Sequence, residues 1–252
     1  MKLYPKKPKS VYFFGTCIVD LLYPEVGLAS INILQREGLE VIFPQKQTCC
    51  GQPAFNSGFH KESLKVASNQ INLFTKEIPI IIPSGSCGGM IRNHFAELFK
   101  KDLLEKEAQS FANRTFELTE FLVNVLKIKL EDKGSPIKTT WHSSCHAKRE
   151  MGIGDSPKEL LGQLKNVELV DLKREEECCG FGGAFSIKEK HISASMVKDK
   201  VDDIIKTEAD LLLGGDCGCL LNISGALKHS GNNIKYLHIA EFIWQRTNIS
   251  KN

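Results

Sequence analysis

The chain has 252 residues, of which 42% are hydrophobic and 25% charged, and this composition excludes an intrinsically disordered protein. The formal net charge is only +3, with acidic residues among the lysines, so the sequence offers no basic stripe for a nucleic acid. No apolar run approaches the roughly 20 residues needed to cross a bilayer, and the N-terminus lacks the apolar core of a signal peptide. We therefore expect a cytoplasmic protein without a transmembrane segment.

The first half of the chain predicts an alternation of strands and helices. Short apolar runs predict strands at 10–14, 39–43, 78–82 and 116–118. Apolar residues at helical spacing predict helices at 24–37, 60–76, 90–99 and 119–126. The polar stretch 100–113 is interpreted as helix or loop.

The second half repeats this order after a polar stretch at 129–138, which we take as the boundary between two units, 1–133 and 134–252. Strands are predicted at 137–142, 167–172, 210–213 and 235–237. Helices are predicted at 156–164, 188–207, from the 214–219 loop to about 227, and at 240–245. The predicted fold class is α/β, with two duplicated Rossmann-like parallel-sheet units related by a pseudo-twofold axis.

Nine cysteines are unusual for a protein of the reducing cytosol, where a disulfide framework is not expected. Two copies of a Cys-Cys-Gly triplet organise them, Cys49-Cys50-Gly51 and Cys178-Cys179-Gly180. Each triplet has single cysteines before and after it, in the patterns Cys-x31-Cys-Cys-Gly-x35-Cys and Cys-x32-Cys-Cys-Gly-x36-Cys. The sequence therefore predicts a duplicated metal-binding unit, and the alternative is a set of buried, inert thiols.

The cysteines also follow predicted strands, whose carboxyl ends meet at one edge of a parallel sheet. Helices expected after Cys87 and Cys217 would direct their N-termini at an anionic group. Neighbouring glycines would let the backbone approach that group. The spacing is neither that of a ferredoxin nor that of a zinc ribbon.

Both units resemble the CCG cysteine-rich domain, which occurs in heterodisulfide reductase and in the iron–sulfur component of glycolate oxidase. Phe14-Gly15-Thr16-Cys17 and Pro83-Ser84-Gly85-Ser86-Cys87 make the chain most similar to the short, two-copy branch of this family that acts in lactate utilisation. The resemblance covers roughly residues 10–244.

The resemblance implies an iron–sulfur redox subunit of a multi-subunit complex that oxidises L-lactate to pyruvate. It implies a ferredoxin-like iron–sulfur subunit and a third lactate-utilisation subunit as partners. It also implies one or two 4Fe–4S clusters of non-cubane type. Their ligands would come from Cys17, Cys49, Cys50, Cys87, Cys145, Cys178, Cys179, Cys217 and Cys219.

The sequence departs from the family pattern, in which each unit carries five cysteines and ends in Cys-x2-Cys. The first unit ends Cys87-Gly88-Gly89-Met90, where Met90 is interpreted as a core methionine, and the second ends Cys217-Gly218-Cys219. We therefore expect the C-terminal site to be the more complete one.

The roles of the other polar residues stay open at this point. His142 and His146 flank Cys145 as ligands or proton-transfer groups, or as capping residues that support the ligands. The sequence assigns no catalytic residue, and Gly180-Phe181-Gly182-Gly183 does not match a site for NAD or ATP. Two other functions are compatible with the cysteines: disulfide reduction of the heterodisulfide reductase kind, and structural zinc binding.

Overall fold

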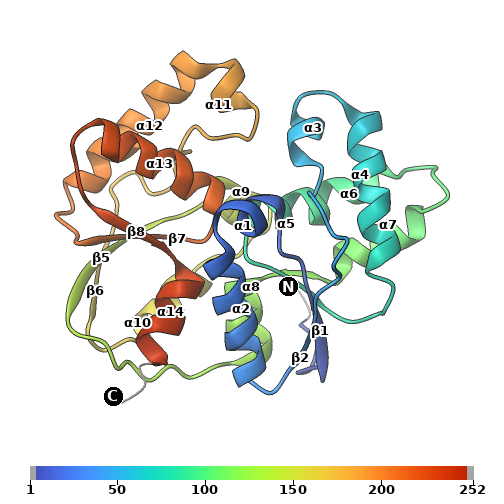
Figure 1. Ribbon diagram of the computed structural model, residues 1–252, viewed down its shortest axis with the longest axis horizontal. Helices are drawn as coiled ribbons and strands as arrows, with labels where there is room; N and C mark the ends of the chain where they lie inside the picture. The colour runs from blue at the N-terminus through green and yellow to red at the C-terminus, as the bar shows by residue number, and fades with distance from the viewer. Residues whose placement is uncertain (1–3, 249–252) are drawn as a thin grey trace.

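The computed structural model describes residues 4–248 and contains two four-stranded sheets in which all strands are parallel (Figure 1). The first sheet has the order β2-β1-β3-β4, with β1 at Ser10–Phe13, β2 at Glu40–Ile42, β3 at Ile80–Ile82 and β4 at Thr115–Glu117. The second has the order β6-β5-β7-β8, with β5 at Ile137–His142, β6 at Val167–Val170, β7 at Leu211–Gly214 and β8 at Lys235–His238. The predicted α/β fold of two duplicated Rossmann-like units is confirmed, and all eight strands lie within two residues of their predicted positions.

Helices connect the strands in the same order in both halves. The first half contains α1 Cys17–Leu22, α2 Pro24–Arg36, α3 Gln52–Asn56, α4 His60–Leu73, α5 Gly85–Gly89, η1 Met90–His94, α6 Phe95–Leu98, α7 Glu105–Asn113, α8 Leu118–Phe121 and η2 Leu122–Leu126. The second half contains α9 Cys145–Arg149, α10 Ser156–Gly162, α11 Phe185–Lys188, α12 Lys190–Ile205, α13 Cys217–His229 and α14 Ile239–Thr247. The unit boundary at residue 133 stays a prediction, and residues 1–3 and 249–252 of the two units lie outside the described residues.

The structure corrects two helix predictions. The helix predicted to begin at Met90 begins at Gly85, because the Ser84 side chain accepts a hydrogen bond from the Cys87 amide and caps it. The stretch 100–113, left as helix or loop, is helical from Glu105. The short helices α1, α3, α9 and α11 were not predicted, since four to six residues are too few to show a helical period.

The two halves pack through equivalent helices. In the first half α2 packs on α14 of the second, and in the second half α10 packs on α8 of the first. By the duplication α2 corresponds to α10 and α8 to α14, so the two contacts are copies related by the predicted pseudo-twofold axis. Figure 1 shows α2 and α14 side by side between the two sheets.

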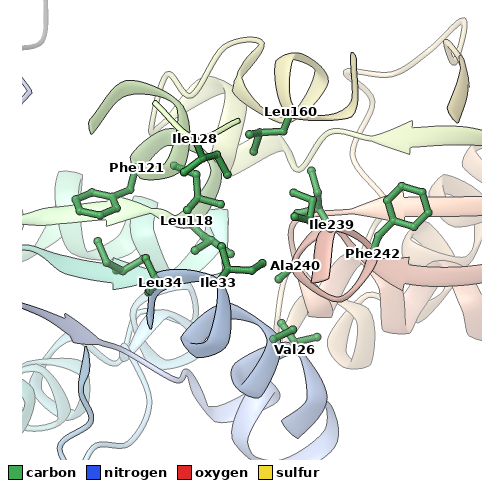
Figure 2. Packing of buried hydrophobic residues seen from close by; sticks show 14 of the residues in the cluster. Val26, Ile33, Leu34, Leu118, Phe121, Ile128, Leu160, Ile239, Ala240 and Phe242 are labelled. Carbon is green, nitrogen blue, oxygen red and sulfur yellow. The ribbon is translucent and has the colours of Figure 1, made fainter. Parts of the chain in front are cut away.

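A single hydrophobic cluster crosses between the halves (Figure 2). Ile33 and Leu34 of α2 lie on one side of it, and Ile239 and Phe242 of α14 lie on the other. Two further clusters belong to one half each, behind the respective cysteine loops. The shared cluster therefore makes the halves one packed unit rather than two independent domains.

Within residues 4–248, the helices are all too short or too polar to span a membrane.

A buried ion pair fixes the connection between the halves to the last helix. Arg246 of α14 donates from Nε and Nη2 to the two oxygens of Asp132, at 2.8 and 2.7 Å, and from Nη1 to the Ser135 carbonyl at 2.6 Å. The side chains of Arg246 and Asp132 are 9% and 0% exposed. Removal of either residue would leave the other as an unpaired charge in a buried site. The stability of this contact therefore depends on both residues.

We predict that Arg246→Leu destabilises the protein by about 3 to 5 kcal/mol, because it leaves the Asp132 carboxylate buried and unpaired. The urea midpoint of unfolding, measured on identically prepared samples, checks this. Glu177→Gln is the matched control, since the Arg174–Glu177 pair is 40% and 48% exposed and should contribute less than about 1 kcal/mol. An equal effect of the two variants would contradict the prediction.

Candidate metal centre

All nine cysteines line one cleft between the two halves. The loops that carry them follow the carboxyl ends of the central strands, and α1, α5 and α9 lie near one another at the centre of the molecule in Figure 1. Contacts between α5 and α9, and between α1 and α13, bring cysteines of the two halves to the same place. The cysteine loops of the two halves therefore converge at one cleft, as predicted.

The first half contributes a chain of four neighbouring thiols. Cys17 begins α1, where Thr16 Oγ1 accepts a hydrogen bond from the Val19 amide and caps the helix. Cys49 lies within hydrogen-bond reach of both Cys17 and Cys50. Cys50 in turn reaches Cys87 in the first turn of α5.

The second half contributes an equivalent chain. The Cys145 thiol donates to Cys178 Sγ at 3.9 Å, and Cys178 also reaches Cys179. Cys179 in turn reaches Cys219 in the first turn of α13. We call these the N-terminal set (Cys17, Cys49, Cys50, Cys87) and the C-terminal set (Cys145, Cys178, Cys179, Cys219).

Strand register corrects the alignment on which the sequence prediction depended. Phe13 pairs with Ile81 in the first sheet, and Trp141 pairs with Leu213 in the second. Since the two pairs are equivalent, the residues that follow them align Ser84 with Asp216 and Cys87 with Cys219. The counterpart of Cys87 is therefore Cys219 and not Cys217, so each set has four cysteines and the C-terminal set is not the richer in thiols.

Cys217 is the ninth cysteine, and it occupies the position that corresponds to Gly85. It is buried in the cluster shared by the two halves, together with Val19 of α1. Burial and then the Asp216 carboxylate raise its pKa, with smaller effects of Cys87 and Cys219. Cys217 thus lies between the two sets.

The glycine of each Cys-Cys-Gly triplet has a conformation that other residues rarely adopt. Gly51 has φ of 87° and Gly180 of 79°. A Cβ at Gly51 would lie 2.9 Å from Ser63 Oγ, and one at Gly180 would lie 2.8 Å from the Ser193 carbonyl oxygen. The turn directs the Gly51 amide to Cys49 Sγ at 3.4 Å and the Gly180 amide to Cys178 Sγ at 3.3 Å.

One cysteine of each set is poised as a thiolate. The pKa of Cys49 is lowered to about 3, because its sulfur accepts hydrogen bonds from the Cys17 and Cys50 thiols. The pKa of Cys178 is lowered to about 2 by the same bonds from Cys145 and Cys179. These bonds, together with burial, raise the pKa of the donating thiols in return.

Such a donor set suits a metal group. Thiolate is the form of cysteine that binds metal, and a metal group bound by each set would replace the protons that the sulfurs now share. The backbone amides of Gly51 and Gly180 would remain as hydrogen-bond donors to ligand sulfur.

Asp216 holds the two cysteine helices together. As the N-cap of α13 it accepts a hydrogen bond from the Gly218 amide at 3.1 Å. Its other oxygen accepts from Ser84 Oγ at 3.1 Å and from the Ser86 amide at 2.9 Å, across the boundary between the halves. Ser84 is itself the N-cap of α5, so one carboxylate positions the helices that carry Cys87 and Cys219.

The segment before each triplet is held by a buried polar residue from the following helix. Gln70 of α4 donates to Thr48 Oγ1 at 2.7 Å and accepts from the Thr48 amide at 3.2 Å. Lys200 of α12, which corresponds to Gln70, donates to the carbonyls of Arg174 and Glu175. The second half thus has a buried ammonium where the first has a neutral amide.

The two histidines next to Cys145 have different surroundings. His146 lies in α9, with Nδ1 3.4 Å from Cys145 Sγ and Nε2 3.4 Å from Glu150 Oε1. His142 ends β5 and is 1% exposed, and burial, followed by the charge of Lys200, lowers its pKa to about 4. Its counterpart in the first half is Phe14.

Met90 is fully buried in the hydrophobic cluster of the first half, where a core methionine is expected.

Sequence reasoning missed Asp216, Gln70 and Lys200. Asp216 precedes Cys217 as a polar residue at the end of an apolar strand, which is the pattern of a helix N-cap. Gln70 and Lys200 are long polar residues on the buried faces of α4 and α12, and their burial follows from tertiary packing that the sequence does not display.

The fold and the cleft define a duplicated α/β protein with two cysteine sites that are related by a pseudo-twofold axis. Comparison with protein families matches the model described as CCG, cysteine-rich domain, at residues 11–92 and 139–224. Together with the relatives below, this places the chain in the family of CCG cysteine-rich proteins that includes lactate utilization protein A.

Two of these relatives are named lactate utilization protein A. The chain is 46% identical to the one from Shouchella clausii, over 93% of this chain and 98% of the relative. It is 44% identical to the one from Halalkalibacterium halodurans, over 92% and 96%. The predicted resemblance is confirmed.

A solved structure shares the fold. The crystal structure of a hypothetical protein from Helicobacter pylori matches 98% of this chain with a TM-score of 0.68 and 13% identity. This chain spans about half, 51%, of that longer chain. At this identity the likeness concerns the fold alone.

We predict that Asp216→Ala destabilises the protein by about 2 to 4 kcal/mol and lowers metal retention in both sets. The substitution removes a helix cap and two hydrogen bonds that cross between the halves. Urea midpoints and metal analysis after gel filtration check it. Asp102→Ala removes an exposed local hydrogen bond to the Leu104 amide and should change neither measurement appreciably. Full metal retention in Asp216→Ala would contradict the prediction.

We predict that Gly85→Cys, which would make the first half like the second, costs about 3 kcal/mol or more. A Cβ at Gly85 would lie 2.5 Å from Ala147 Cβ and 2.9 Å from backbone atoms of the same residue. Thermal unfolding measures the loss. Gly225→Ala is the control, because nothing lies within 4 Å of its Cβ and the exposed helical position favours alanine by up to about 1 kcal/mol.

Proposed function

We propose that the chain is an iron–sulfur redox subunit of a complex that oxidises L-lactate to pyruvate. The observation that carries the proposal is the pair of matched four-cysteine sets in one cleft. The relatives' name supports lactate utilisation as the pathway. When bound, the clusters would supply one-electron transfer for the two electrons that leave lactate. The cysteines of the two sets would hold them, and the Gly51 and Gly180 amides would donate to ligand sulfur.

The spread of the thiols supports a multi-iron group over a single zinc ion. Tetrahedral zinc with Zn–S bonds of about 2.3 Å brings its sulfurs to within about 3.8 Å of one another. Within residues 4–248, three donor atoms lie mutually within 4.8 Å only at His142, Cys179 and Cys219. The four thiols of either set thus form an extended chain rather than a shell around one point.

The partners in this proposal are a ferredoxin-like iron–sulfur subunit, which would take the electrons, and a third subunit of the lactate-utilisation system. The cytoplasm is the proposed location, because it is the compartment that keeps nine thiols reduced. Adjacent cysteines such as Cys49 and Cys50 would suit a cluster of non-cubane type, in which each of the two thiolates could bind a different iron.

We predict that the anaerobically purified chain is brown and holds about eight iron atoms, one 4Fe–4S cluster per set. Cys49→Ser and Cys178→Ser should each remove about half of the iron, because each replaces the central thiolate of one set. Cys217→Ser should keep the full iron content, because Cys217 lies outside both sets. Iron and sulfide analysis with visible absorption checks the three variants.

A colourless protein with stoichiometric zinc, even after anaerobic reconstitution with iron and sulfide, would reject the cluster. Loss of iron in Cys217→Ser would show that Cys217 is a ligand, as the sequence analysis expects. Lactate oxidation by the assembled complex, compared with reduction of disulfide substrates, separates the proposed reaction from the heterodisulfide reductase alternative. Cys178→Ser should abolish whichever reaction the complex performs.

A further inference from the structure

His142 is a buried imidazole without a hydrogen bond. Neither Nδ1 nor Nε2 has a partner among the described residues, although the side chain is 1% exposed. A buried polar group left unsatisfied costs about 1 to 3 kcal/mol, so its presence requires a physical reason.

The imidazole also lies among the C-terminal cysteines. A ring nitrogen of His142, Cys179 Sγ and Cys219 Sγ all lie within 4.8 Å of one another. Three metal donors at this separation are close enough to meet on one metal group, and a free ring nitrogen is a common metal ligand. A metal bound there would satisfy a nitrogen that the protein leaves without a partner.

The duplication supplies an internal comparison. The corresponding residue of the first half is Phe14, which is fully buried in the cluster behind the N-terminal set. The backbone position is thus compatible with an apolar side chain, and an apolar side chain there leaves no unsatisfied atom. The need for a polar residue at this position is specific to the C-terminal set.

We propose that His142 is a ligand of the metal group held by the C-terminal set, which makes this a mixed thiolate–imidazole site while the N-terminal set stays all-thiolate. The inference rests on the proposed function, because it requires a cluster at Cys145, Cys178, Cys179 and Cys219. The buried ammonium of Lys200, where the first half has Gln70, favours the more negative, reduced state of a centre beside it and so raises the reduction potential of that centre. The C-terminal centre is then the electron acceptor of the pair.

The test is pulsed electron paramagnetic resonance of the reduced, anaerobically purified full chain, made with 15N-histidine or with natural-abundance histidine. We expect a strong hyperfine coupling to a histidine nitrogen that changes with the isotope. Cys178→Ser should remove this signal, and Cys49→Ser should keep it. His142→Phe, which copies the first half, should remove the coupling and keep the iron of the N-terminal set.

His146→Phe is the matched control, because His146 touches Cys145 but has Glu150 as a partner. It should keep the coupling. A coupling that survives in His142→Phe and disappears in His146→Phe would overturn the assignment. So would an iron-loaded wild-type C-terminal site without any histidine coupling, a result that needs no variant to fold. Absence of iron from that site would overturn both this inference and the proposed function. Iron analysis therefore distinguishes a failure of this inference alone, in which iron is present without the coupling, from a failure of both, in which iron is absent.

Discussion

The hydrogen bond between Ser84 and Asp216 is the contact around which the two cysteine sites are arranged. These residues are equivalent by strand register and touch each other, so they lie on the pseudo-twofold axis. Each is also the N-cap of a helix that carries a cysteine in its first turn. Because one short polar contact sets the separation of α5 and α13, it also sets the separation of the two cysteine sets. A group bound at one set would therefore be held at a fixed distance from the other set.

The division of the hydrophobic core serves the same arrangement. The shared cluster between α2, α8, α10 and α14 joins the halves and reaches the cleft at Cys217, while a separate cluster supports the triplet of each half. Cys50 belongs to one of the separate clusters and Cys179 to the other, so the second cysteine of each triplet is anchored in its own half. Packed interiors resist deformation, and the cysteine loops are thereby mounted on rigid elements.

The strands and cysteine loops could be predicted because their information is local: apolar runs of strand length end at a cysteine or at the loop before one. The short helices that begin at Cys17 and Cys145 could not be predicted, because six and five residues are too few to show a helical period of apolar residues. The equivalence of Cys87 and Cys219 could not be predicted either. The step from Cys50 to Cys87 is closer in length to the step from Cys179 to Cys217 than to the step from Cys179 to Cys219, so spacing favours Cys217 as the counterpart. Strand register is a property of paired backbones, and it alone shows that α13 begins with an additional cysteine in the place of a glycine.

Gly85 and its counterpart Cys217 show one difference in packing between the duplicated halves. α5 approaches α9 so closely that Gly85 faces Ala147 without room for a Cβ, whereas Cys217 packs in the shared cluster that includes Val19, the counterpart of Ala147. The other differences lie around the C-terminal set, with His142 for Phe14 and Lys200 for Gln70. The thiols themselves are matched, so a difference in chemistry between the two sites would come from such neighbours. Under the proposed function, an imidazole and an ammonium beside one set only, in an otherwise repeated scaffold, would make the two sites unequal as electron acceptors.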